Sequence, residues 1–157
     1  MNRTQQEPPP GRLRRRTVLK NALAIAGTAC LPAAIAAPED VDAAVTALFG
    51  DRTPQTGKVT VKIPPISENG YSVPMSVKVD SPMTTQDHVV RIAIFAEENP
   101  IALVANFELG PRSGLANIQS RVRMGGSQRI RAVAEMSDGT LWSGYAFSIV
   151  TLAACVV

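Results

Sequence analysis

Residues that commonly carry chemistry are scarce in this chain of 157 residues, which has two cysteines and one histidine. A type 1 copper site needs two histidines beside a cysteine, so the lone His88 cannot form one. We expect His88 to be an exposed polar residue at the start of a strand. The chain also lacks carboxylate pairs at catalytic spacing, a phosphate-binding loop and a Gly-x-Ser-x-Gly motif. These absences argue against an autonomous hydrolase, and we predict neither a metal site nor catalysis by the chain itself.

The amino-terminal residues 1–36 are typical of an export signal rather than of a folded domain. Arg15 and Arg16 form a twin-arginine motif with the Thr-Val-Leu-Lys that follows, and a short alanine-rich stretch precedes the cleavage site Ala34-Ile35-Ala36. The apolar stretch is too short and too rich in alanine and glycine to span a membrane. The segment therefore predicts export by the twin-arginine pathway to a bacterial periplasm.

The positive charge of the chain is concentrated in this signal. Residues 1–36 hold six of the sixteen basic residues and one of the thirteen acidic residues, which leaves ten basic and twelve acidic residues in the remainder. The mature protein is therefore weakly acidic. It also has no pattern of basic and aromatic residues that would indicate nucleic-acid binding.

Residues 37–57 predict a short helix followed by a polar connection. Apolar residues recur at helical spacing from Val41 to Leu48, acidic residues occupy the expected first turn, and Gly50 follows the last apolar residue. Pro54 and Gly57 then interrupt any regular element.

Residues 58–152 show the alternation of apolar and polar residues that is typical of β-strands. Seven such segments, separated by turns rich in glycine, proline, asparagine and aspartate, predict an all-β immunoglobulin-like antiparallel β-sandwich. Pro74 within the second segment predicts an edge strand or a bulge. In the last segment, Tyr145, Phe147 and Ile149 should share one face. The expected strands cover 59–63, 73–79, 90–96, 103–109, 115–124, 128–136 and 141–152.

Four arginines flank the turn at Gly125-Gly126. If Val122 and Ile130 face each other across a hairpin with their side chains in the core, the arginines project from the opposite face. Such a face could dock an acidic partner or steer an anion, although a solvated face balanced by nearby acids is the commoner arrangement. The four are Arg121, Arg123, Arg129 and Arg131. Glu97 and Glu98, by contrast, are expected to lie in a solvated turn.

Cys155 is the one cysteine expected in the mature protein, because Cys30 lies within the signal. It belongs to residues 153–157, which we expect to form an arm beyond the last strand, reaching roughly 10 Å past Leu152 at Cys155 if extended. A single thiol in an exported protein pairs with another chain, is protected, or reacts. No histidine, lysine or arginine lies within the last ten residues to lower the pKa of the thiol.

These features together resemble the SoxY family, the sulfur-carrier subunits of the bacterial thiosulfate-oxidising (Sox) system. The matching stretches include Ile66–Val73 (ISENGYSV), Ile94–Pro100 (IFAEENP) and Ala134–Leu141 (AEMSDGTL), and they lead into a cysteine near the carboxyl terminus. Further matches are Phe49-Gly50-Asp51, Gly57-Lys58-Val59-Thr60 and Val79–Thr84 (VDSPMT).

The resemblance implies a covalent carrier rather than an enzyme. In such a system the chain pairs with a SoxZ-like subunit as a heterodimer. A haem-containing SoxAX-like enzyme attaches thiosulfate to the carrier cysteine, and a SoxB-like hydrolase then releases sulfate. The residue in the matching position is Cys155, so we expect a sulfur or thiosulfonate adduct on its thiol and no separate cofactor.

The arm departs from the family pattern Gly-Gly-Cys-Gly-Gly. Cys155 is flanked here by Ala153 and Ala154 on one side and by Val156 and Val157 on the other. Valine is β-branched and stiff beside the sulfur, where glycine would permit close approach to an enzyme channel. An exported interaction module that is linked to its partner by an interchain disulfide, with no covalent cargo, is therefore the alternative.

Overall fold

A computed structural model of the protein describes residues 40–152. Helix α2 (Val41–Phe49) begins at Asp40, whose carboxylate accepts a hydrogen bond from the Asp42 N–H at 2.9 Å. It ends at Gly50, which has a φ of 72° that favours glycine. The helix predicted from the apolar spacing is thus present, with its cap and its terminating glycine. No helix within the described residues is long and apolar enough to cross a membrane.

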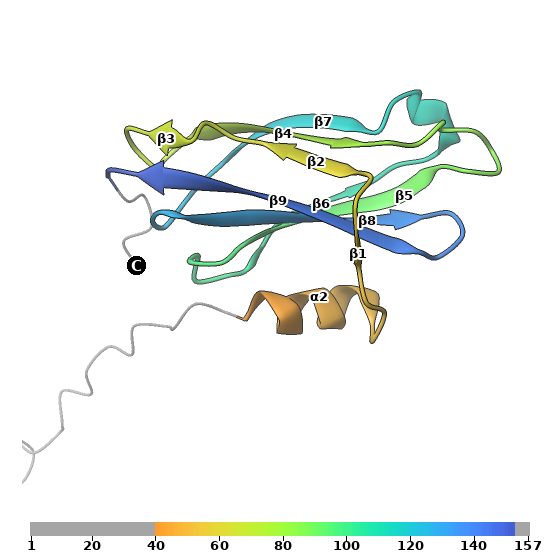
Figure 1. Ribbon diagram of the computed structural model, residues 1–157, viewed down its shortest axis with the longest axis horizontal. Coiled ribbons are helices and arrows are strands. Elements are labelled where there is room, and N and C mark those ends of the chain that lie inside the picture. The colour runs from red at the N-terminus through yellow and green to blue at the C-terminus, as the bar shows by residue number, and fades with distance from the viewer. Residues whose placement is uncertain (1–39, 153–157) are drawn as a thin grey trace, which may run out of the picture. The chain divides into compact units, whose positions relative to one another are not determined.

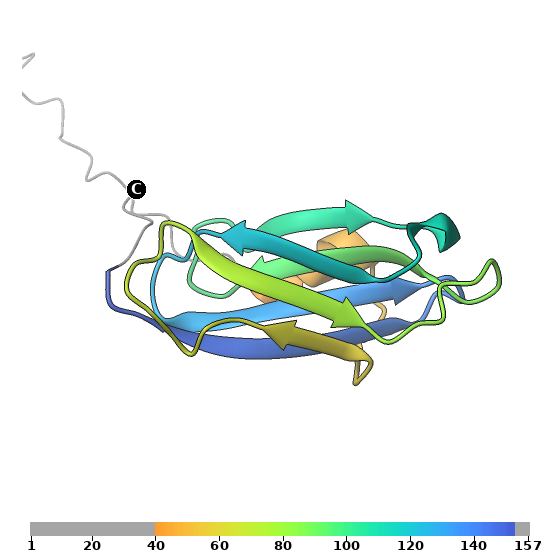
Figure 2. The ribbon, with the colours of Figure 1, turned by 90° about the horizontal axis from the view of Figure 1, so that it is seen from above.

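The strands form two sheets packed face to face, as the sequence predicted for an immunoglobulin-like β-sandwich (Figure 1). The larger sheet has the order β1-β9-β8-β5-β6, and β3 also pairs with β9. The smaller sheet, in front in Figure 2, has the order β2-β4-β7. The seven longer strands are β2 (Val59–Lys62), β4 (Val73–Val79), β5 (Val89–Ala96), β6 (Leu103–Glu108), β7 (Asn117–Val122), β8 (Gln128–Met136) and β9 (Leu141–Val150).

Three short elements complete the fold. The two-residue strands β1 (Gln55–Thr56) and β3 (Ile66–Ser67) each pair in parallel with β9, at its two ends. The 3₁₀-helix η1 (Pro111–Ser113) connects β6 to β7 at the end of the sandwich opposite to the end of β9 (Figure 1). Strand β1 lies within the connection that the sequence predicted to be irregular.

Two apolar clusters hold the layers together. One fills the space between the sheets and contains fully buried side chains such as Val77, Ile92 and Ile130. The other packs Val45 and Phe49 of α2 against the outer face of the larger sheet, where Phe95 lies. Because α2 covers only part of that face, the remainder, carried by β8 and β9, stays open.

Strand β4 corrects one prediction from the sequence. It lies between β2 and β7 and is therefore a central strand, not an edge. Pro74 is tolerated because β2 ends at Lys62, opposite Ser76, so β7 is the one strand that pairs with β4 at Pro74.

Candidate functional site

The described chain ends at Leu152, so Cys155 and the arm residues Ala153, Ala154, Val156 and Val157 lie outside the described residues. The root of the arm is held by two backbone hydrogen bonds. The Thr151 N–H donates to the Ser67 carbonyl at 3.1 Å, and the Gly70 N–H donates to the Leu152 carbonyl at 2.8 Å. The segment that bears the cysteine therefore leaves the sandwich from a fixed point.

Gly70 also connects the root of the arm to the loop between β7 and β8. While its N–H bonds Leu152, its carbonyl accepts a hydrogen bond from the Met124 N–H at 2.9 Å. Ser127, in the same loop, accepts a hydrogen bond from the Val150 N–H at 2.9 Å through its hydroxyl. The end of β9, β3 and this loop thus share one end of the molecule (Figure 1).

A buried amide pair fixes the conformation of that loop. The side chain of Asn99 donates to the Arg123 carbonyl at 2.9 Å and accepts from the Gly125 N–H at 2.8 Å. Gln128 donates to the same Asn99 oxygen at 3.0 Å and accepts from the Glu98 N–H at 2.8 Å. Both amide side chains are buried, so these bonds satisfy groups that would otherwise be costly to bury. Glu98 itself is exposed in a turn, as expected.

The four arginines do not form the single hairpin face that the sequence predicted. Val122 and Ile130 are both buried, but β7 pairs with β4 in the smaller sheet, whereas β8 pairs with β5 and β9 in the larger one. The predicted pairing of Val122 with Ile130 is wrong, because the Gly125-Gly126 segment crosses between sheets instead of closing a hairpin. Arg121 and Arg123 consequently belong to one face of the sandwich, and Arg129 and Arg131 to the other.

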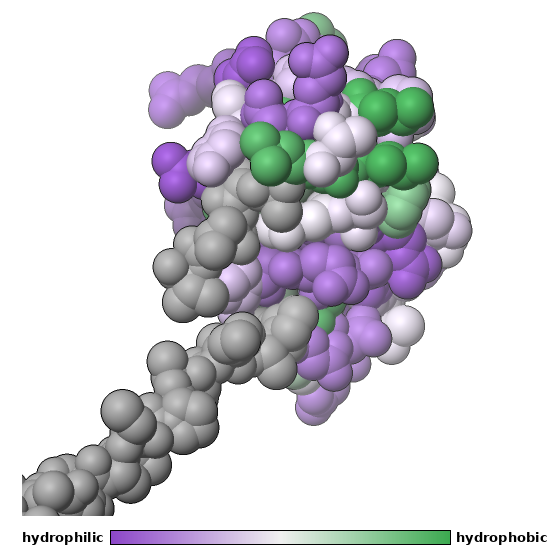
Figure 3. Space-filling view, turned by 90° about the vertical axis from the view of Figure 1, so that its left-hand side faces the viewer, coloured by the Kyte–Doolittle hydropathy of each residue, from purple (hydrophilic) through white to green (hydrophobic). Residues whose placement is uncertain are grey.

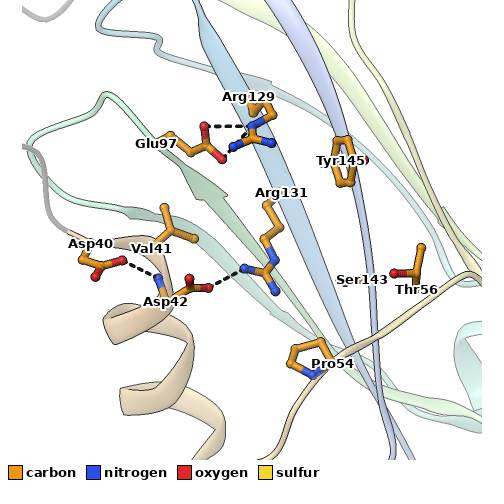
Figure 4. Close-up of a pocket in the computed structure, with 10 residues that line it drawn as sticks. All are labelled: Asp40, Val41, Asp42, Pro54, Thr56, Glu97, Arg129, Arg131, Ser143 and Tyr145. Atoms are coloured by element: carbon orange, nitrogen blue, oxygen red, sulfur yellow. Dashed lines mark hydrogen bonds and ion pairs between the residues drawn. The ribbon is translucent and has the colours of Figure 1, made fainter.

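Arg129 and Arg131 are paired with acids beside the start of α2 (Figure 4). Arg129 Nε lies 3.0 Å from a Glu97 carboxylate oxygen, and Arg131 Nη1 lies 2.7 Å from Asp42 Oδ1. The hydrogen bond to Glu97 raises the pKa of Arg129 above its ordinary value. With Tyr145 these residues line a pocket of about 540 Å³, whose arginine charges are already balanced.

Arg121 and Arg123 are exposed and have no acidic partner among residues 40–152. Arg121 instead donates to Ser72, from Nε to the hydroxyl at 2.7 Å and from Nη2 to the carbonyl at 3.2 Å. Arg123 adjoins Met124, which bonds Gly70, and Arg121 bonds Ser72, two residues after Gly70. Both arginines are therefore near Gly70, which is hydrogen-bonded to the root of the arm.

Apolar side chains are exposed along β9 toward the same end. Tyr145, Phe147 and Ile149 share one face, as predicted, and the structure shows that this face points outward, with the three side chains 66%, 53% and 46% exposed. Ile66 of β3, the register partner of Ile149, is 64% exposed. Seen from this end, the molecule shows apolar atoms gathered between hydrophilic ones (Figure 3). An apolar stripe of this kind is characteristic of surfaces that bind other proteins.

His88 lies at the opposite end of the sandwich, just before β5. Its ring Nδ1 is 3.1 Å from the Thr84 carbonyl, and its backbone N–H donates to the Ser137 hydroxyl at 3.2 Å. His88 is half-buried rather than exposed, and these contacts stabilise the turn that precedes β5. Within the described residues, no three histidine, cysteine, aspartate or glutamate side chains come together as a metal site would require.

Sequence reasoning missed Gly70, Asn99 and Gln128. The turn around Asn99 was predicted from Glu98-Asn99-Pro100, but a turn signal does not show that the asparagine side chain is buried. The contacts of Gly70 are made by its backbone, so its side-chain type carries no signal for them.

Comparisons with known proteins support a family assignment. A comparison with curated proteins gives no significant match. Among solved structures, the sulfur carrier protein SoxY from Chlorobium limicola f. thiosulfatophilum is 29% identical, with a TM-score of 0.61, and the match covers 71% of this chain and 96% of that one.

Two superoxide reductases share the fold alone. The enzyme from Ignicoccus hospitalis, a neelaredoxin, is 13% identical with a TM-score of 0.53, and the match covers 60% of this chain and 80% of that one. The enzyme from Nanoarchaeum equitans is 12% identical with a TM-score of 0.51, and the match covers 60% and 99%.

The family model for the sulfur oxidation protein SoxY matches residues 45–155, a range that takes in α2 from Val45, the whole sandwich and Cys155. Since this match covers most of the sequence and agrees with the fold, the chain belongs to the SoxY family.

Proposed function

We propose that this protein is a periplasmic sulfur carrier that holds thiosulfate-derived sulfur covalently on Cys155. The observation that carries the proposal is that the family match extends to residue 155, although the arm differs from the glycine-rich family pattern. The solved SoxY structure with 29% identity is described as a sulfur carrier protein, which supports the same role. The sandwich then serves as a rigid base, and residues 153–157 present the thiol.

The loading step is an oxidative conjugation. The Cys155 thiolate forms an S–S bond with the outer sulfur of thiosulfate, giving Cys–S–S–SO₃⁻, and two electrons pass to a haem enzyme of the SoxAX class. Hydrolysis by a SoxB-like enzyme consumes water, breaks the bond to the sulfonate sulfur, and releases sulfate and two protons, which leaves Cys–S–S⁻. Cys155 supplies only the nucleophile, and a thiol reacts as its thiolate.

The partner in this proposal is a SoxZ-like subunit that forms a heterodimer with the chain. The apolar stripe of Tyr145, Phe147, Ile149 and Ile66 supports such pairing, because exposed apolar side chains gain free energy when a partner removes them from water. A twin-arginine signal at residues 1–36 would allow the assembled pair to be exported together.

The test is the intact mass of the protein isolated from thiosulfate-oxidising cells, measured with and without reductant. A reductant-labile adduct with the mass of thiosulfate or of sulfane sulfur, mapped to Cys155, is the expected result. The Cys155→Ser variant should carry no adduct and should stop thiosulfate oxidation while keeping its fold. A free thiol would contradict the carrier function, and a disulfide to another chain in place of an adduct would establish the interaction module.

A further inference from the structure

Two of the four arginines that flank Gly125-Gly126 carry charge that no acid within residues 40–152 neutralises. Arg129 and Arg131 are paired with Glu97 and Asp42, whereas Arg121 and Arg123 have no acidic partner within residues 40–152. Unpaired guanidinium groups attract anions, and their fixed donors suit flat or tetrahedral oxyanions. Within residues 40–152, Arg121 and Arg123 are thus the two arginines of the cluster whose charges remain available to bind an anion.

This pair lies beside the root of the arm. The Gly70 backbone is hydrogen-bonded to Leu152 on one side and to Met124 on the other. Met124, which follows Arg123, is therefore separated from Leu152 by one intervening chain, that is, by twice the distance between hydrogen-bonded neighbours. At strand spacing this amounts to about 10 Å. Cys155 is three residues beyond Leu152 and cannot be farther from it than roughly 10 Å. A group attached to the thiol can therefore reach the arginine side chains.

Both arginines are supported by neighbouring groups. Two hydrogen bonds to Ser72 hold the Arg121 guanidinium and leave its other N–H groups available. The backbone of Arg123 is fixed by the bond from Asn99, so its exposed side chain extends from a rigid loop. Lys62 lines the same groove as Arg121 and adds a third positive charge. Glu68, whose carbonyl binds the Thr151 hydroxyl, makes no ion pair with either arginine in the described part of the chain.

We propose that Arg121 and Arg123 form a binding site for the sulfonate group of a thiosulfate adduct on Cys155. This inference rests on the proposed carrier function and names the place where the loaded arm is held. An unloaded, neutral thiol gains nothing from the site, whereas the Cys–S–S–SO₃⁻ form carries the anion that arginine recognises. The two arginines therefore distinguish the loaded state of the arm from the empty state.

Tetrathionate loads the thiol without any partner enzyme, so the site can be tested on the isolated chain. The Cys155 thiolate attacks the central S–S bond of tetrathionate, forms Cys–S–S–SO₃⁻ and releases thiosulfate, with no external oxidant. The experiment uses the full chain with Cys30→Ser, so that Cys155 is the single thiol. Loading is followed by intact mass at low and at high ionic strength.

The double variant Arg121→Gln with Arg123→Gln should load roughly tenfold more slowly at low ionic strength, because it removes the attraction for the anionic reagent. High salt should abolish that difference. Iodoacetamide, which is neutral, should alkylate Cys155 at the same rate in both proteins. Arg112→Gln is the matched control, since it removes an exposed arginine from η1 at the opposite end of the sandwich.

A second measurement tests whether the adduct is bound after loading. In ¹⁵N-labelled protein, the side-chain Nε–Hε signals of Arg121 and Arg123 should shift when Cys155 carries Cys–S–S–SO₃⁻. They should not shift when the thiol is blocked with iodoacetamide. The Arg129 signal, whose donor is already engaged by Glu97, should stay in place in both cases.

Unchanged loading rates in Arg123→Gln and in the double variant, together with unshifted arginine signals, would overturn this inference. Arg123→Gln alone keeps the test valid if loss of the Ser72 contacts disturbs the double variant. Neither result depends on whether Sox enzymes load the protein in cells. The carrier function is decided separately, by the adduct on protein from thiosulfate-oxidising cells.

Discussion

Gly144 of β9 lies against the backbone carbonyl of Val59 in β2, so closely that a Cβ at residue 144 would overlap the Val59 oxygen. This contact brings the edge of the smaller sheet against the strand that leads to the arm. Both sides of the contact are backbone, so neither can move away as a flexible side chain could. The close approach explains why β9 has a glycine at residue 144, where any larger residue would collide with the backbone of β2.

Replacing Gly144 with alanine should lower the free energy of unfolding by about 1–3 kcal/mol, because the added methyl group forces the two sheets apart. Denaturant unfolding of the purified protein measures the effect. Gly126→Ala is the control, since a methyl group added at that residue would have no neighbouring atom within 4 Å, and its change should stay within about 0.5 kcal/mol. Equal stabilities of the two variants would show that β2 and β9 are not held this closely.

Replacing Asn99 with alanine should cost about 2–4 kcal/mol of the free energy of unfolding. The substitution removes the Asn99 partner of the partly buried Gly125 N–H and Arg123 carbonyl and of the buried Gln128 amide. Thermal and denaturant unfolding measure the loss. Asn106→Ala, at an exposed position of β6, should change the stability by less than about 0.5 kcal/mol. An Asn99 variant as stable as the Asn106 variant would contradict the role of the amide pair.

The Asp138 turn predicts a pH dependence of stability. Hydrogen bonds from the Thr140 side chain and backbone lower the pKa of Asp138 in the folded state. A lowered folded pKa adds stability above the unfolded value, near ~4, and that stability is lost as the pH falls through the folded pKa. The difference in melting temperature between wild type and Asp138→Ala should therefore be larger at pH 6 than at pH 2. A difference that is constant from pH 6 to pH 2 would exclude this contribution.

The substituted arm predicts a preference among loading enzymes. Replacing Ala153, Ala154, Val156 and Val157 with glycine restores the family pattern and removes branched side chains beside the sulfur. The variant should then be loaded severalfold faster by enzymes that act on Gly-Gly-Cys-Gly-Gly carriers, as measured by the rate at which the adduct mass appears. The rate of Cys155 alkylation by iodoacetamide is the control for the general accessibility of the thiol. An unchanged enzymatic rate would show that the valines do not obstruct the channel.

The sequence was sufficient to predict which residues of a strand share a face, but not which strands are neighbours. The alternation in β9 correctly divided its residues between two faces, with Tyr145 and Phe147 on one and Ser148 on the other, but it did not show that the Ser148 face is the buried one. Asp40 and Gly50 bounded the helix because capping is a local interaction. Val122 and Ile130 are both buried as predicted, yet in different sheets, because alternation fixes the face of a strand and carries no information about its partner.

The candidate site was predictable only in part. Cys155 and the four arginines could be named from the sequence, but the division of those arginines into paired and unpaired ones depends on the tertiary positions of Asp42 and Glu97. Strands β1 and β3 are two residues long and join β9 through backbone hydrogen bonds, which leave no pattern in the sequence. The link between Leu152 and Met124 through Gly70 is of the same kind.

The hydrogen bond that fixes Leu152 to Gly70 has a kinetic consequence. Because Cys155 lies three residues beyond the hydrogen-bonded Leu152, an enzyme bound at this end of the sandwich would meet the thiol at an effective concentration in the mM range or above. Reaction within the complex can then be fast even when the complex itself is weak. For the carrier function proposed above, successive enzymes need only bind briefly, act on the same sulfur atom and depart, so rapid turnover among them would require no tight complex with any of them.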